Sequence, residues 1–199
     1  MNKQDQDLIL IEKTRHFIQS ALPTECTAHD WQHCERVFKM ALLITEAETK
    51  ATTKINNQNN VNKLVIALAA LLHDLDDWKF NDQKKIIATK AKKWLQILNL
   101  PNNVVQHVCT IIQEIPFKGN AVDSQISTFE GQIVQDADRL DAVGAIGIAR
   151  AFAYGGFKQR CIYDPKISPQ IHASFAEYKS TQGTTINHFY EKLLMLKDR

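Results

Sequence analysis

A histidine and a histidine–aspartate pair are the residues in this sequence best suited to metal chemistry. His33 lies one turn before Val37 on the apolar face of an expected helix, where a buried imidazole needs partners for its ring nitrogens. Considered alone, His33 fits a hydrogen-bonded core histidine better than a metal ligand. His73 and Asp74 follow the apolar run of residues 68–72, and a carboxylate there is costly unless it is paired or binds a cation.

More carboxylates follow this pair. Asp77 lies four residues after His73 and shares its helical face, whereas Asp76 lies on the same turn but points elsewhere. Two or three carboxylates beside an imidazole repel one another unless a cation lies between them. The alternative is that the helix end turns into solvent and that Asp76 and Asp77 are simply hydrated.

The acidic segment 135–141 adjoins an expected helix that is rich in small residues. Asp138 aligns with Ala142 and the alanines that follow it, on a face where another helix can pack closely. Asp136 and Asp141 lie on other sides of the helix. The alternative interpretation is a carboxylate-rich first turn that complements the helix dipole.

Together these segments supply two imidazoles and two carboxylates, from His33, His73, Asp74 and Asp138. Mixed nitrogen and oxygen ligands suit one divalent ion such as Mn²⁺, Fe²⁺, Ni²⁺, Co²⁺ or Mg²⁺ better than a structural zinc. Four protein ligands on an octahedral ion leave two positions for water or a phosphate oxygen. This set therefore predicts metal-assisted hydrolysis, in which the ion lowers the pKa of water and screens charge on phosphorus.

Helices are the elements expected to position these residues. Gly and Pro make up only 7 and 5 of the 199 residues, and strand patterns are nearly absent. The sequence therefore predicts an all-α fold. Apolar periodicity and helix-breaking residues predict helices over residues 5–19, 30–49, 63–78, 81–98, 101–115, 134–154 and 184–196.

Composition excludes several classes of protein. A hydrophobic content of 44% supports an ordinary globular core, and 24 basic against 22 acidic residues provide no polybasic field for nucleic acid or membranes. The longest apolar stretch, Leu64–Leu72, is far shorter than the roughly 20 residues of a membrane helix, and the N-terminus lacks the apolar region of a signal peptide. The four cysteines form no C-x-x-C pair. We therefore expect a cytoplasmic protein that binds neither nucleic acid nor membranes.

Segments 29–37, 70–80 and 134–145, in this order, resemble the HD superfamily of metal-dependent phosphohydrolases, and particularly its small stand-alone bacterial members. The resemblance extends over about residues 28–197. It implies an HD-domain helical bundle with additional peripheral helices. The expected organisation is a single domain over residues 1–199, with a metal-binding core at about 28–156 and a C-terminal helical extension at about 157–199.

The resemblance also selects the metal ligands. The family carries its first metal histidine three residues before an Arg-Val pair, which implies His33 rather than His29. It carries its last metal aspartate immediately before Arg-Leu, which implies Asp138 rather than Asp136. Asp77 matches an acidic residue that transfers protons in ppGpp-hydrolysing relatives, and is the expected catalytic acid and base. Those relatives have Glu-Asp at this point, where this chain has Asp77 and Trp78.

Similar members include nucleotide pyrophosphohydrolases, which makes a nucleoside triphosphate or a related phosphate ester the expected substrate. The expected reaction is attack on phosphorus by metal-activated water. The candidate substrate contacts are Lys79, Lys118, Arg139 and His29. For each cation the alternative is a solvated surface charge, and Arg139 has the further alternative of an ion pair with a neighbouring aspartate. The rival function is a non-catalytic HD module that senses a nucleotide or a metal; a homodimer is one alternative for the assembly.

Overall fold

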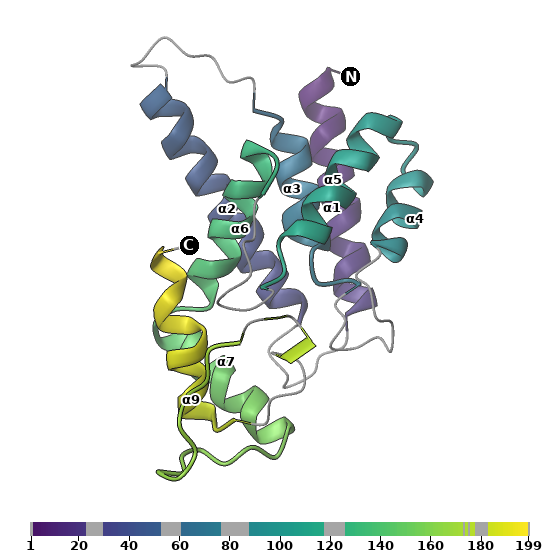
Figure 1. Cartoon of the computed structure of the whole chain (residues 1–199). Helices are drawn as coiled ribbons and strands as arrows, with labels where there is room; N and C mark the ends of the chain where they lie inside the picture. The colour runs from purple at the N-terminus through teal and green to yellow at the C-terminus, as the bar shows by residue number, and fades with distance from the viewer. Residues whose placement is uncertain are drawn as a thin grey trace. The chain divides into compact units, whose positions relative to one another are not determined.

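The computed structural model describes residues 2–22, 30–52, 61–76, 88–117, 126–172, 174, 176–177 and 183–198. Within these ranges every regular element is a helix, so the predicted all-α fold is confirmed (Figure 1). No helix in the described part is both long and apolar enough to cross a bilayer. The elements are α1 (Lys3–Ala21), α2 (Trp31–Thr52), α3 (Lys63–Leu72), α4 (Thr89–Ile97), α5 (Asn102–Glu114), α6 (Phe129–Asp141), α7 (Gly144–Phe157), α9 (Thr185–Glu191) and the 3-10 helix η1 (Leu193–Asp198).

The chain divides into two compact units. The first comprises Met1–Thr24, His29–Ile115 and Ile126–Asp138, and contains α1 to α5 and most of α6. The second comprises Glu25–Ala28, Pro116–Gln125 and Arg139–Arg199, and contains α7, α9 and η1. The organisation into a single domain with a metal-binding core and a C-terminal extension stays a prediction.

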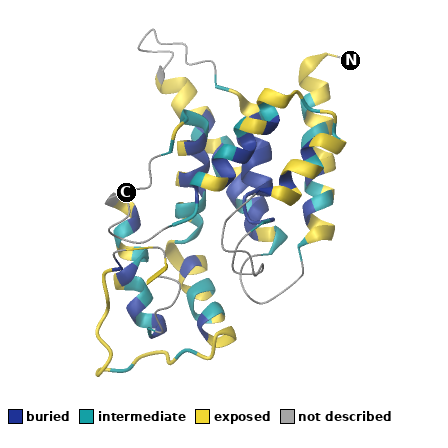
Figure 2. Ribbon diagram, turned by 45° about the vertical axis from the view of Figure 1, so that its right-hand side comes forward, coloured by how far each residue is buried: buried dark blue, intermediate teal, exposed yellow. Residues whose placement is uncertain are grey.

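The core of the first unit is built around α3. Residues 65–72 of this helix are all buried, as expected for a helix that is apolar on every side. It packs against α1, α2 and α5, and Figure 2 shows buried residues concentrated in the middle of this unit. The residues that directly follow α3 therefore begin in the interior of the unit.

Polar and aromatic contacts fix α2 and α4 against α1. The guanidinium of Arg15 donates to both carboxylate oxygens of Glu35, from Nε at 2.9 Å and from Nη2 at 2.7 Å. The rings of Phe17 and Trp94 stack with their centroids 4.0 Å apart. The indole Nε1 of Trp94 also donates to Thr14 Oγ1 at 3.0 Å. Both α2 and α4 thus have fixed positions on the same helix.

The predicted helix over 63–78 is wrong at its end. The α-helix stops at Leu72 and residues 73–76 form a turn, in which Leu75 N–H donates to the Leu72 carbonyl at 3.1 Å. Carboxylates are unfavourable at the negative C-terminal end of a helix dipole, and Asp74 and Asp76 both lie there.

The predicted helix over 81–98 is also wrong, because Ala88 is not helical (φ −25°, ψ 47°) and α4 begins at Thr89. The predicted start of that helix at Asn81 lies outside the described residues.

The single helix predicted over 134–154 is two helices in the structure. α6 begins earlier, at Phe129, and ends at Asp141, and α7 begins at Gly144. Gly144 has a φ of +73°, a backbone conformation that glycine adopts without strain. The expected alignment of Asp138 with Ala142 and the later alanines on one continuous helix is therefore wrong, since the helix that carries Asp138 ends at Asp141 and a separate helix begins at Gly144.

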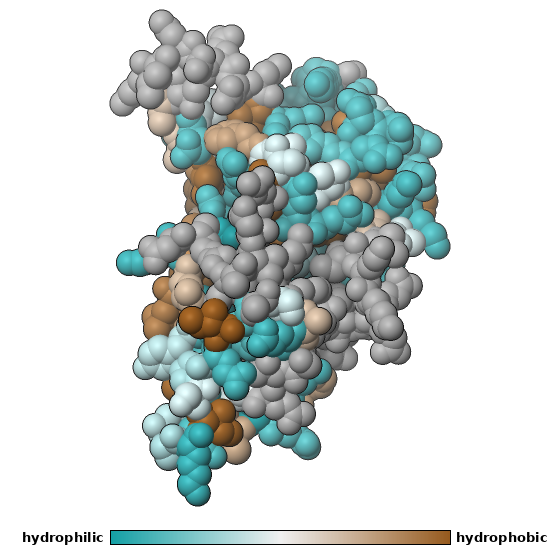
Figure 3. All heavy atoms as spheres, viewed as in Figure 1, coloured by the Kyte–Doolittle hydropathy of each residue, from teal (hydrophilic) through white to brown (hydrophobic). Residues whose placement is uncertain are grey.

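The second unit is held largely by buried polar side chains. Thr184, at the start of the predicted helix over 184–196, caps α9 by accepting from Asn187 N–H at 3.1 Å. The end of that prediction is wrong, since the α-helix stops at Glu191 and the 3-10 helix η1 follows. The amide of Asn187 donates to the Ile167 carbonyl at 2.9 Å, and Glu191 accepts from Gln170 N–H at 3.0 Å. Most of the large hydrophobic side chains exposed in the described part belong to this unit, and Figure 3 shows hydrophobic patches on one of its faces.

Candidate metal centre

The start of α2 places His33 in the interior of the first unit. Asp30 immediately precedes the helix, and its Oδ1 accepts from the backbone N–H of His33 at 2.8 Å. This is an N-cap interaction, so the helix start is fixed at the candidate ligand itself. The His33 side chain is 1% exposed and lies on the same face as the fully buried Val37 and Ala41. An aspartate three residues before His33 was the sequence signal for this cap.

His73 is oriented by the backbone of α3. Its Nδ1 atom lies 2.8 Å from the carbonyl oxygen of Ala70. Because a carbonyl only accepts, Nδ1 carries the proton, and in the neutral ring Nε2 keeps its lone pair. A histidine that donates one ring N–H to a backbone carbonyl is held in the tautomer that binds a metal through the other nitrogen.

Four side chains from three separate segments converge at this point. The Nε2 atoms of His33 and His73 lie 3.2 Å apart. Asp138 Oδ1 is 3.3 Å from the first of these nitrogens and 3.7 Å from the second. Asp74 approaches the two imidazoles with different oxygens, at 3.4 Å from His33 and 3.5 Å from His73. The structure therefore brings together all four residues that the sequence singled out as metal-binding.

The spacing of these donor atoms fits a small divalent cation. Two donors bound at about 2.1 Å to one ion lie about 3.0 Å apart at a right angle and about 3.4 Å apart at a tetrahedral angle. The ligand atoms of His33, His73 and Asp138 all lie within 4.8 Å of one another, and the individual separations begin at 3.2 Å. A set of nitrogen and oxygen donors without thiolate suits Mn²⁺, Fe²⁺, Co²⁺, Ni²⁺ or Mg²⁺.

The charge on Asp138 is strongly stabilised. Burial raises the pKa of Asp138, but the hydrogen bond to His33 and the charge of His73 together outweigh burial and hold that pKa well below its usual value. The negative charge of Asp74 opposes them. Asp138 is therefore ionised at neutral pH, and the cluster requires positive charge in return, from protonated imidazole or from a bound cation.

Of the five other site residues named from the sequence, the structure describes only Arg139. Asp77, His29, Lys79 and Lys118 lie outside the described residues. Arg139 follows Asp138 in α6, is half-buried, and belongs to the second unit.

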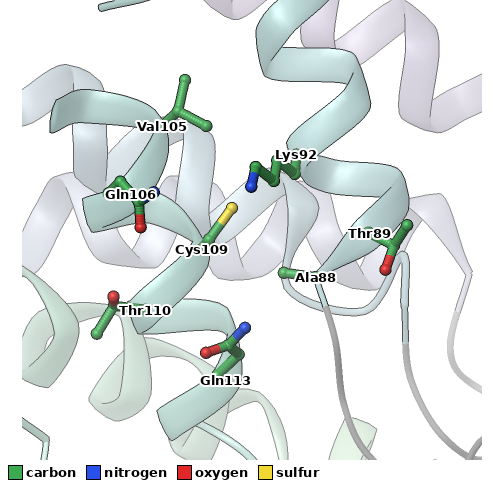
Figure 4. Close-up of a pocket in the computed structure, with 8 residues that line it drawn as sticks. All are labelled: Ala88, Thr89, Lys92, Val105, Gln106, Cys109, Thr110 and Gln113. Carbon is green, nitrogen blue, oxygen red and sulfur yellow. The ribbon is translucent and has the colours of Figure 1, made fainter. Parts of the chain in front are cut away.

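A pocket of about 330 Å³ opens between α4 and α5 (Figure 4). None of the four candidate metal ligands is among its lining residues, which are Ala88, Thr89, Lys92, Val105, Gln106, Cys109, Thr110 and Gln113. Burial raises the pKa of the Cys109 thiol. The charge of Lys92 lowers this pKa by less than burial raises it, and the charge of Asp76 makes a smaller contribution that raises it. The described residues that line this pocket are therefore not those of the donor cluster.

The segments that supply this cluster match a known protein family. The family model of the HD domain matches residues 30–143, a stretch that includes all four candidate ligands. The protein YpgQ of Bacillus subtilis is 33% identical over 195 residues, which cover 97% of this chain and 82% of YpgQ.

Solved structures agree with this match. A protein from Lactobacillus plantarum superposes with a TM-score of 0.78 and 32% identity, over 100% of this chain and 85% of that protein. An HD-superfamily hydrolase from Bacillus thuringiensis superposes with a TM-score of 0.65 and 40% identity, over 96% and 82% of the two chains. YpgQ in complex with ADP superposes with a TM-score of 0.67 and 31% identity, over 97% and 81%.

Proposed function

This chain belongs to the HD domain family, and we propose that it is a metal-dependent phosphohydrolase that acts on a nucleotide. The observation that carries this proposal is the convergence of His33, His73, Asp74 and Asp138 from three separate segments, with separations between 3.2 and 3.7 Å. Four buried or partly buried donors of this kind are costly together unless a cation balances them.

In the proposed site these four residues hold one divalent cation. When bound, the ion supplies Lewis-acid activation of water and screens the charge that develops on phosphorus. His73 is kept in its binding tautomer by the Ala70 carbonyl, and the start of α2 holds His33 in place through Asp30. Because these supports are made by the backbone and by a helix cap, the donor set is preorganised before substrate arrives.

The proposed substrate is a nucleoside triphosphate or a related phosphate ester. Support comes from YpgQ, a relative that has been crystallised with ADP. In the pyrophosphohydrolase form of the reaction, the water oxygen bonds to the α-phosphorus and the bond from this phosphorus to the bridging oxygen breaks. Pyrophosphate leaves, and the nucleoside monophosphate keeps the water oxygen.

The remaining roles belong to residues named from the sequence. We assign proton transfer to Asp77, because a carboxylate beside other carboxylates is suited to act as a general acid and base. Lys79, Lys118, Arg139 and His29 are proposed contacts for the substrate phosphates, since a polyanion needs fixed cations or donors near its oxygens.

A nucleotide panel tests the proposed function. Nucleoside di- and triphosphates and simple phosphomonoesters are incubated with the protein and Mn²⁺, Mg²⁺, Ni²⁺ or Co²⁺, and products are separated by anion-exchange chromatography. Reactions in ¹⁸O-water then show, by mass spectrometry, which phosphorus was attacked. We expect nucleoside monophosphate carrying ¹⁸O, and no turnover by the His73→Ala and Asp74→Ala variants.

Two results would contradict this assignment. Turnover by folded His73→Ala at the wild-type rate would show that the metal centre takes no part in the reaction. Tight nucleotide binding without product, across all four metals, would favour the rival function of a nucleotide-sensing HD module.

A further inference from the structure

We propose that Asp76 is a positioning residue of the metal centre, which ties the turn carrying His73 and Asp74 to the start of α4. This inference rests on the proposed function, because it concerns how the donor cluster is held. Its basis is a hydrogen-bond arrangement between two segments of the first unit that are more than ten residues apart.

The carboxylate of Asp76 caps α4. Its Oδ2 accepts from the backbone N–H of Lys90 at 2.9 Å and from that of Ala91 at 3.1 Å, and its Oδ1 is 3.2 Å from Lys90 N. These are the second and third residues of the helix, whose N–H groups a local N-cap side chain ordinarily satisfies. The residue in the local cap position is Ala88, which has no side-chain acceptor. Asp76 therefore supplies from a distance the cap that α4 lacks.

The cap is also favourable electrostatically. A carboxylate at the N-terminal end of a helix faces the positive end of the helix dipole, and its hydrogen bonds to N–H groups are charge-assisted. By contrast, the C-terminal end of α3, where Asp76 lies in the chain, is unfavourable for negative charge. The negative charge of Asp76 is therefore more stable beside the start of α4 than it would be at the end of α3 alone.

α4 is a firm attachment point because other contacts hold it. Trp94 of α4 stacks on Phe17 of α1 and donates to Thr14. The turn after α3 is therefore held at both ends, by the hydrogen bond of His73 to Ala70 at its start and by Asp76 at its end. Asp74 lies between these two points and faces the imidazoles.

The test measures metal affinity rather than turnover. Mn²⁺ is titrated by calorimetry into the wild type and into Asp76→Ala, Asp76→Asn and Asn2→Ala. Asp76→Ala should raise the Kd for Mn²⁺ about tenfold, because residues that orient metal ligands contribute affinity on this scale. Asp76→Asn keeps an acceptor oxygen and should stay close to the wild-type value. Asn2→Ala removes the matching side-chain cap of α1 and should leave the Kd unchanged.

A second measurement needs no variant, and decides the question if Asp76→Ala does not fold. Coupling is reciprocal, so Mn²⁺ should slow amide exchange at Lys90 and Ala91 in the wild type, by up to about tenfold. The capped amide of Asp5 in α1 is the internal control.

Unchanged affinity in folded Asp76→Ala overturns the positioning role, as does unchanged exchange at both α4 amides. A wild-type protein that binds no divalent metal would instead overturn the proposed metal centre itself.

Discussion

The Nε2 atom of His33 lies 3.2 Å from the Nε2 atom of His73, although the two residues are 40 positions apart in the chain. The Nδ1 proton of His73 is already donated to the Ala70 carbonyl. Two neutral Nε2 lone pairs facing each other at this distance repel, so the arrangement requires either a proton or a cation between them. Asp74 and Asp138 surround the same point with negative charge, which favours a cation.

Asp138→Asn should remove most of the bound metal, whereas Asp136→Asn should not. Asp138 shares one oxygen between both imidazoles, whereas Asp136 is exposed on another side of α6. We expect the metal content after gel filtration, measured by elemental analysis, to fall at least about tenfold in the first variant only, because the site loses a charged donor. Equal loss in the two variants would show that the acidic segment acts through its overall charge.

Mn²⁺ should stabilise the folded protein through this cluster. At a free concentration one hundred times its Kd, a ligand that binds only the folded state adds about 2.7 kcal/mol to the free energy of unfolding. We expect this increase in urea unfolding of the wild type after removal of metal with a chelator and addition of Mn²⁺. His73→Ala should show none of it, since the variant lacks one of the converging donors. An equal Mn²⁺ effect in this variant would place the metal elsewhere.

Glu35→Ala should destabilise the first unit by about 1.5–3 kcal/mol, because hydrogen bonds to charged groups contribute on this scale. The Glu35 side chain is 11% exposed and accepts two hydrogen bonds from Arg15, which join α2 to α1. Glu12 also pairs with Arg15, but its side chain is 55% exposed. Glu12→Ala should therefore change stability by less than about 0.5 kcal/mol. Urea unfolding monitored by circular dichroism separates the two, and similar losses would contradict the buried role of Glu35.

Cys109 should react with iodoacetamide more slowly than Cys161. Burial raises the pKa of Cys109, and a raised pKa lowers the fraction of reactive thiolate at any pH below it. Cys161 is exposed. Time-resolved alkylation at mildly alkaline pH, followed by peptide mass spectrometry, should show Cys161 modified at least about tenfold faster. Raising the pH should speed the reaction of Cys109. Faster modification of Cys109 would mean that the α4–α5 packing opens readily.

Much of the fold followed from local patterns. The run of apolar residues 65–72 predicted a buried helix, and it is the core helix of the first unit. The start of the last predicted helix was correct, because the hydroxyl of Thr184 accepts a hydrogen bond from a free backbone N–H group of the first turn. Helix ends were less predictable. The break at Gly144 and the early end of α3 depend on one backbone conformation and on where carboxylates find partners, and residue periodicity records neither.

The sequence by itself determined which side chains could bind a metal, because imidazoles and carboxylates beside buried helices are costly without a partner, and the order of the three segments marked the HD family. The tertiary structure decided that these side chains meet, with donor atoms 3.2 to 3.7 Å apart. It also decided that Asp76, which the sequence only indicated to point away from the face of His73, caps α4. Such contacts join segments far apart in the chain, and only the packing of helices brings those segments together.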